Sequence, residues 1–268
     1  MADTNLIFDI GCHRGEDSRF YLRKGFRVIA VEANPALCRE LRDTFSSEIT
    51  NGQFRLIESA IADAPGQVEF FVNSAHSIWG TIRSEFVERD KENFFPIVVP
   101  SITFGSLLED HGVPRYLKID IEGADMLCLE GLLSASDRPD FVSFESGRKT
   151  VSALRSELSL LTRLGYARFQ LVDQKTVQRQ KEPFPAREGQ YADCELAPDA
   201  TGLFGLELPG RWHSPPGFTA SYMKILARDR LTGLAKRVAL PDLIHGSWYD
   251  IHAAKVGSLI PAGATVSG

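Results

Sequence analysis

The sequence predicts an α/β protein with a Rossmann-like, doubly wound and mainly parallel sheet, helices on both faces of that sheet and a loop-rich C-terminal extension. Apolar runs alternate with amphipathic segments from residue 6 to residue 173, as βαβ units require. The runs are apolar almost throughout, which is typical of strands buried on both faces. Beyond residue 173 the alternation stops, and residues 174–218 are rich in proline, glycine and charge.

The individual elements follow from this pattern in chain order. Core strands are expected at residues 6–10, 27–33, 54–62, 116–121, 139–146 and 167–173, with further short strands at 67–72 and 97–104. Helices are expected at residues 16–24, 34–45, 105–112, 123–133 and 150–165. Residues 221–228 fit either a strand or a helix, and residues 247–255 are expected to pack back on the core.

The segment from residue 34 to residue 45 shows how a helix is recognised here. Asn34 is a good N-cap, and Pro35 at the first helical position has the fixed φ that a helix start needs. Leu37, Leu41 and Phe45 then recur at helical spacing and form one apolar stripe. The segment is therefore an amphipathic helix that lies on the sheet.

Composition excludes several classes of function. The formal net charge of −5 offers no bulk attraction to nucleic acid or to an anionic membrane. No CxxC pair occurs among the four cysteines, so a disulfide framework or a cysteine metal cluster is not expected. No apolar run reaches membrane-spanning length, and the first strand begins almost at once. We expect a cytoplasmic protein without a membrane span or a nucleic-acid partner.

The first strand ends in "DIGCHRGED", which has the form of a ligand-binding turn. Gly11 and Gly15 lie where a strand leads into a helix, and backbone N–H groups and the helix dipole face a ligand there. Glu32 follows at the end of the second strand, where a carboxylate can accept hydrogen bonds from both ribose hydroxyls. The alternative is that the two glycines only shape a turn. Together with Glu32, they indicate a nucleoside site.

The nucleoside can belong to NAD or to S-adenosylmethionine. A dinucleotide loop carries a middle glycine, because the pyrophosphate rests against the backbone at that point. His13 stands at that position here. A side chain there argues against a pyrophosphate, whereas S-adenosylmethionine has no phosphate. The sequence also contains no GxxxxGK[ST] loop. S-adenosylmethionine is therefore favoured, and an NAD-dependent oxidoreductase is the alternative.

A second group of polar residues stands in "YLKIDIEGADMLCLEGL". Asp120 and Glu122 bracket the end of the fourth core strand, next to Gly123 and a following helix. Side chains two residues apart on a strand face the same way, so both carboxylates are expected to point at the strand's tip. The alternative is that they are acids at a helix N-terminus, which is a common arrangement.

Four stretches, in this order and at suitable spacing, resemble the FkbM family of class I S-adenosylmethionine-dependent methyltransferases. They are "DIGCHRG", "VIAVEANP", "ESAIADAPGQVEFFV" and "LKIDIEGADMLCLEGL". The family's first loop typically reads D-x-G-A-N-x-G, and Cys12 and His13 replace the alanine and the asparagine here. The resemblance implies O-methylation of a hydroxyl on a saccharide, a glycoconjugate or a polyketide-like natural product. A non-catalytic S-adenosylmethionine-binding protein is a further alternative.

The resemblance also assigns residues and domains. The cofactor-binding positions that it implies are Asp9, Gly11, Cys12, His13, Gly15, Glu32, Ala33, Ser59, Ala60 and Asp120. Asp9, Gly11 and Gly15 would hold the methionine moiety, and Ala33, Ser59 and Ala60 would border the adenine. Residues 1–173 would form the S-adenosylmethionine-binding core. Residues 174–268 would form an extension, packed on the same domain, that covers the acceptor site.

Methyl transfer to an alcohol needs help, because an alcohol is a poor nucleophile at neutral pH. We expect Asp120 and Glu122 to supply that help, either directly or through Mg²⁺, although no metal-ligand pattern is present in the sequence. His76 is the histidine best placed to act as a base, and Trp79 near it could stack on a sugar. The partner expected is a small-molecule or saccharide acceptor, and the oligomeric state stays open.

Overall fold

The computed structural model describes residues 2–146, 150–237 and 248–259. The strands are β1 (Asp3–Ile10), β2 (Arg27–Glu32), β3 (Phe54–Glu58), β4 (Ala60–Ile61), β5 (Gly66–Asn73), β6 (Phe94–Ile102), β7 (Pro114–Ile119), β8 (Phe141–Ser146), β9 (Tyr166–Asp173) and β10 (Tyr249–Lys255). The α-helices are α1 (Glu16–Arg23), α2 (Pro35–Thr44), α3 (Ser46–Thr50), α4 (Ser84–Val87), α5 (Phe104–His111), α6 (Asp125–Gly131), α7 (Val151–Arg163) and α8 (Pro215–Arg237). Short 3₁₀ helices are η1 (Ser77–Trp79), η2 (Leu132–Ser134), η3 (Gln174–Arg179) and η4 (Gly205–Glu207).

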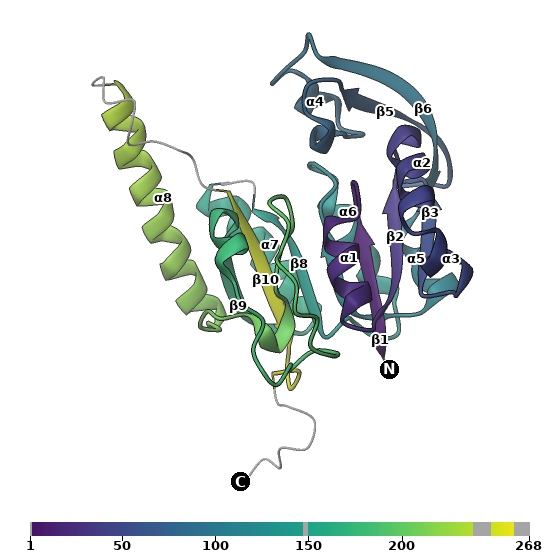
Figure 1. The fold of residues 1–268 in the computed structure, drawn as a ribbon. Coiled ribbons are helices and arrows are strands. Elements are labelled where there is room, and N and C mark those ends of the chain that lie inside the picture. Colours follow the sequence, from purple (N-terminus) through teal and green to yellow (C-terminus); the bar gives the residue numbers. More distant parts are fainter. Residues whose placement is uncertain (1, 147–149, 238–247, 260–268) are drawn as a thin grey trace.

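The described residues form one large sheet with the strand order β3-β2-β1-β7-β8-β10-β9 (Figure 1). Neighbouring strands are parallel, except that β10 runs antiparallel to both β8 and β9. The predicted Rossmann-like, mainly parallel sheet is therefore confirmed. The chain order reverses between β1 and β7, and ligands bind at the carboxyl ends of the strands beside such a reversal.

Each face of this sheet carries its own hydrophobic core, because successive side chains on a strand alternate between the faces. On one face, Leu6 and Phe8 of β1 pack with apolar residues of α5, α6 and α7. On the other face, Ile7 packs with residues of α1, α2 and the C-terminal extension. The extension contributes Phe204, whose ring stacks on that of Tyr116 with the centroids 4.4 Å apart. The helices therefore cover both faces, as expected.

Residues 247–255 do more than pack back on the core. Residues 249–255 form β10, which lies between β8 and β9 inside the large sheet. Every residue of β10 except its last is buried, including Asp250 and His252. These polar residues break the apolar run from which a buried strand is recognised. The extension thus supplies a strand of the large sheet, and residues 221–228 belong to the helix α8.

The predicted strand at 54–62 is divided between two sheets. β3 ends at Glu58, Ser59 intervenes, and β4 pairs with β6 in a second sheet of order β4-β6-β5. In Figure 1 this small sheet and α4 stand beyond the carboxyl ends of β1 and β2. Residues 74–93, which join β5 to β6 and contain η1 and α4, are called the cap segment below. None of the helices in the described ranges is both long and apolar enough to cross a membrane.

Candidate cofactor and acceptor site

A cavity lies at the carboxyl ends of β1, β2 and β7, beside the reversal of strand order. Open α/β sheets bind their ligands at such a place. The predicted cofactor residues that line it are Gly11, Cys12, His13, Glu32, Ala33, Ser59, Ala60 and Asp120. The structure therefore gathers these residues, which are far apart in the sequence, around one space. Asp9 and Gly15 are not in its lining.

The two glycines of the first loop have different tasks. Gly11 has a φ of +77°, and a Cβ there would lie 1.9 Å from the backbone oxygen of Asp120. Gly11 thus lets the loop after β1 pass directly against the loop after β7. Gly15 also has a φ of +77°, but its Cβ would meet the ring of Phe45 at 2.4 Å. Gly15 therefore allows the start of α1 to pack on Phe45, and Gly15 itself does not line the cavity.

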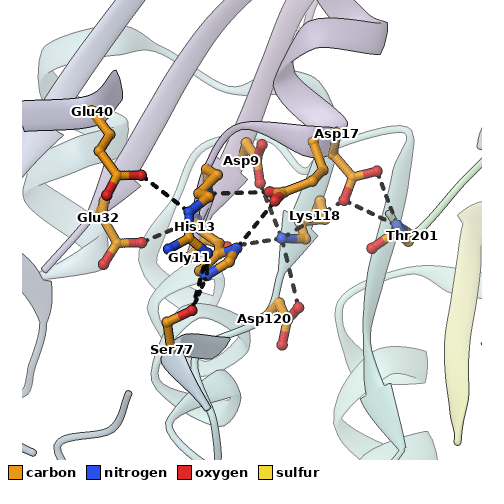
Figure 2. Close-up of polar contacts among 12 residues, drawn as sticks. Asp9, Gly11, His13, Asp17, Glu32, Glu40, Ser77, Lys118, Asp120 and Thr201 are labelled. Atoms are coloured by element: carbon orange, nitrogen blue, oxygen red, sulfur yellow. Dashed lines mark hydrogen bonds and ion pairs between the residues drawn. The ribbon is translucent and has the colours of Figure 1, made fainter. Parts of the chain in front are cut away.

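Asp9 is fully buried and holds a lysine that sequence reasoning missed (Figure 2). One oxygen of Asp9 accepts the Ser18 hydroxyl at 2.6 Å, and the other lies 3.2 Å from Nζ of Lys118. The same Nζ donates to the carbonyl oxygen of Gly11 at 2.9 Å. Asp9 thus acts on the cavity indirectly, through Lys118, which does line it. The available signal was a single lysine inside the apolar run "YLKIDI".

Lys118 is shared by three carboxylates at the carboxyl edge of the sheet. Besides Asp9, its Nζ lies 3.8 Å from Asp120 and 3.9 Å from Asp17. Burial disfavours the ammonium charge, but these carboxylates outweigh burial and raise the pKa of Lys118 well above its usual value. Burial raises the pKa of Asp17 to about 7. The backbone N–H of Thr201 donates to both oxygens of Asp17 at 3.0 Å, which joins the extension to this end of the cavity.

Glu32 fixes the first loop while it faces the cavity. Its Oε2 accepts from the backbone N–H of His13 at 3.0 Å, and its Oε1 accepts from that of Asn34 at 2.8 Å. Burial raises the pKa of Glu32 despite these hydrogen bonds. Each carboxylate oxygen has a second lone pair, so Glu32 can still accept hydrogen bonds from a ligand's hydroxyls.

The side chain of His13 joins the first loop to the cap segment. Its Nε2 lies 2.9 Å from the hydroxyl oxygen of Ser77, and its Nδ1 lies 3.2 Å from a carboxylate oxygen of Glu16. Arg14 also donates to the Ser77 hydroxyl, at 3.1 Å. His13, Ser77 and Glu16 all line the cavity. The contact between His13 and Ser77 therefore closes one edge of the cavity.

We expect Ser77→Ala to loosen this edge. Loss of the hydrogen bonds to His13 and Arg14 should speed amide hydrogen exchange in residues 78–82 by about two- to ten-fold, because a neutral hydrogen bond contributes about 1 kcal/mol. Ser74→Ala is the matched control, since that hydroxyl donates to the Asn93 carbonyl at the other end of the cap segment. Equal exchange in the two variants, followed by mass spectrometry, would contradict this role of Ser77.

Glu122 points at the cap segment. β7 ends at Ile119 and Glu122 has a φ of +47°, so the two-residue period of a strand does not extend from Asp120 to Glu122. Its carboxylate accepts from Arg89 at 2.9 Å, and its backbone oxygen accepts from the Thr81 hydroxyl at 2.8 Å. Burial, followed by the charges of Asp120 and Glu145, raises the pKa of Glu122 to about 8. Glu122 is not part of the cavity lining.

Asp120 is the carboxylate of the pair that faces the cavity. Its side chain is 49% exposed and lines the cavity, with Lys118 on one side. The surrounding walls withdraw water from it and raise its pKa above the usual value, even though half of its surface faces the open space. His76 is exposed and lies outside the lining, where its ring packs on Trp79 at 4.2 Å. Within the described ranges, no three His, Cys, Asp or Glu side chains are placed to hold a metal ion.

Comparison with known proteins places the chain in a family. The methyltransferase FkbM domain matches residues 9–167, which is more than half of the sequence. The chain belongs to the FkbM methyltransferase family. This confirms the resemblance seen in the sequence motifs, and membership implies S-adenosylmethionine as the methyl donor. The sequence matches none of the curated proteins with which it was compared.

Solved structures that are similar to this chain are methyltransferases as well. The methyltransferase FkbM from Methylobacillus flagellatus has 15% identity and a TM-score of 0.43, with 65% of this chain and 41% of that chain covered. The precorrin-6y C5,15-methyltransferase from Geobacter metallireducens has 13% identity and a TM-score of 0.39, with 95% and 82% covered. A SAM-dependent methyltransferase from Archaeoglobus fulgidus has 13% identity and a TM-score of 0.38, with 94% and 87% covered. The chain thus spans less than half of the first of these proteins.

Proposed function

We propose that this FkbM-family chain transfers the methyl group of S-adenosylmethionine to a hydroxyl group of a small-molecule acceptor, of the saccharide, glycoconjugate or polyketide-like class. The observation that carries the proposal is the single cavity lined by Gly11, Glu32 and Asp120. Gly11 and Asp120 directly follow β1 and β7, Glu32 is the last residue of β2, and the three meet where the strand order reverses. This arrangement suits a nucleoside ligand, independently of the family resemblance.

The side chains that line the cavity fit S-adenosylmethionine better than a dinucleotide. Glu32 offers carboxylate lone pairs to ribose hydroxyls, and Ala33, Ser59 and Ala60 form a small, mostly apolar wall beside it for an adenine ring. The positions near Gly11 that a pyrophosphate would need are occupied by the His13 side chain and its contact with Ser77. At the other end, the mixed charges of Lys118, Asp17 and Asp120 suit an amino-acid moiety, which carries both a cation and an anion.

The reaction requires alignment, exclusion of water and removal of a proton. When bound, S-adenosylmethionine supplies a methyl group for in-line displacement, and the acceptor oxygen must approach on the side opposite to the sulfur. Ile78, Ile82 and Ile121 line the cavity and give it an apolar side on which a bound acceptor would displace water. Asp120 accepts the acceptor's hydroxyl proton, because it is the exposed carboxylate at the strand tip. Lys118 positions Asp120 and balances its charge.

Calorimetry with S-adenosylmethionine, S-adenosylhomocysteine and NAD tests the proposed cofactor. Both sulfur compounds should bind, and Glu32→Gln should weaken that binding by about ten- to a hundred-fold, because a hydrogen bond to a charged group contributes about 1.5–3 kcal/mol. Glu58→Gln is the matched control: Glu58 pairs with Glu32 in the sheet register but is exposed and outside the cavity lining.

The outcomes separate the possible functions. Binding of NAD alone would contradict the proposal and favour an oxidoreductase. Binding of S-adenosylmethionine without methyl transfer to any hydroxylated acceptor, followed with labelled cofactor, would favour a non-catalytic binding protein. Transfer to a nitrogen or carbon atom would retain the methyltransferase and contradict the hydroxyl acceptor.

A further inference from the structure

One residue of the C-terminal extension lines the cofactor cavity. Among the described residues of the extension, Asp199 alone belongs to this lining, together with Glu16, Asp17 and Lys118 from the core. Asp199 lies outside residues 9–167, which the family domain matches. The family motifs therefore assign it no role.

The fold presents Asp199 at the tip of a tight turn. The Ala200 N–H donates to the carbonyl oxygen of Ala197 at 3.2 Å, which closes a four-residue turn. Pro198 is the second residue of this turn, a position that suits its fixed φ. Leu196 and Ala200 on either side are buried, whereas Asp199 is exposed. The turn is thus anchored in the protein on both sides of Asp199.

The turn lies at the end of the cavity that carries the mixed charges. Two residues after Asp199, the Thr201 N–H donates to both oxygens of Asp17 at 3.0 Å (Figure 2). The next N–H, of Gly202, donates to one of these oxygens at 3.4 Å. Two residues of chain span at most about 7 Å, so Asp199 lies near Asp17 and its neighbour Lys118. This is the end where the amino-acid moiety of the cofactor is proposed to bind.

Asp199 is the carboxylate at this end whose oxygens are free. Both oxygens of Asp17 accept from the backbone of the extension. Asp9 is buried and outside the lining, and Asp120 lies 3.8 Å from Lys118 and is assigned to the acceptor hydroxyl. In the part of the chain that the structure describes, the side chain of Asp199 makes no hydrogen bond or ion pair. Its lone pairs are therefore available to the N–H groups of a ligand.

We propose that Asp199 binds the α-ammonium group of S-adenosylmethionine, and that the extension thereby completes the cofactor site. The assignment rests on the proposed use of S-adenosylmethionine as the methyl donor. An ammonium group has three N–H donors and no acceptor, so a carboxylate with free lone pairs is a strong partner for it. Lys118, the only lysine or arginine among the described lining residues, suits the carboxylate of the same moiety. The bound cofactor then joins the extension to the carboxyl edge of the sheet.

Calorimetry of the full chain with three ligands tests this assignment. S-adenosylhomocysteine carries both charges, its decarboxylated analogue carries only the ammonium group, and its deamino analogue carries only the carboxylate. Asp199→Asn should weaken binding of the first two ligands by about ten-fold or more, the usual contribution of a hydrogen bond between charged groups. It should not weaken binding of the deamino analogue. Equal weakening of all three ligands, or of none, would overturn the assignment.

The matched control is Glu195→Gln, which removes an exposed acid of the same extension that is not in the cavity lining. It should leave all three dissociation constants unchanged, and an effect as large as that of Asp199→Asn would overturn the assignment. Hydrogen exchange gives a second readout. With each ligand at saturation, amides of residues 199–203 should exchange more slowly with S-adenosylhomocysteine than with the deamino analogue, and equal protection would contradict the link between cofactor and extension. If the unmodified chain bound none of the three ligands, the proposed cofactor itself would be wrong.

Discussion

Replacement of Asp120 by asparagine is expected to lower kcat by about 10²- to 10⁴-fold, the usual contribution of a general base. Asparagine has nearly the same shape, so it should keep the loop after β7 in place against Gly11. The dissociation constant of S-adenosylhomocysteine should change by less than about ten-fold, because the asparagine side chain keeps one oxygen that can accept a hydrogen bond. Single-turnover kinetics with labelled cofactor, combined with calorimetry, would measure both effects.

The pH profile gives an independent test of the same role. A general base acts in its deprotonated form, so kcat/KM should rise with pH through the pKa of Asp120, which is raised above the usual aspartate value. The Asp120→Asn variant should lose this rising limb.

Glu122→Gln is the matched comparison for Asp120→Asn. It removes one carboxylate from the same loop, but its expected effect is on the cap segment, through the lost ion pair with Arg89. The exchange of cap amides and KM should therefore change more than kcat. If Glu122→Gln abolished turnover while Asp120→Asn left it intact, the base would be Glu122.

The sequence was sufficient for most of the fold and failed where polar residues are buried. Nearly continuous apolar runs identify β1, β2, β7 and β8, because strands covered on both faces select such runs. β10 does not have that signature, since Asp250 and His252 interrupt it. Their burial depends on neighbours from β8 and β9, far away in the sequence. Local patterns do not contain that information.

The residues of the candidate site could likewise be predicted from the sequence only in part. Gly11 and Glu32 could be predicted, because a tight turn and a carboxylate at a strand tip follow from spacing alone. The role of His13 could not be predicted, because its partner Ser77 is 64 residues away, in the cap segment that joins two strands of the small sheet. The side chain of Glu122 points to the cap segment and not into the cavity, because β7 ends three residues before it and Glu122 has a positive φ.

Lys118→Met is expected to destabilise the protein by about 3–5 kcal/mol, the cost of removing one partner from a buried ionic group. Lys118 is the shared cation of Asp9, Asp17 and Asp120, and its side chain is 5% exposed. Methionine matches the length of the lysine stem but leaves the carboxylates to repel one another. Urea unfolding monitored by circular dichroism would measure the loss.

The pH dependence of this loss distinguishes electrostatics from packing. Without Lys118 the pKa values of Asp17, already about 7, and of Asp120, already raised, increase further in the folded state, so the folded variant takes up protons as the pH falls. The destabilisation should therefore be full at alkaline pH, where both carboxyls are charged, and should shrink toward pH 4. Lys255→Met, which breaks a more exposed pair with Asp137, should cost at most about 1 kcal/mol. A loss at Lys118 that did not change with pH would indicate a packing defect, and the lysine's role as the shared counter-charge of the cavity would be wrong.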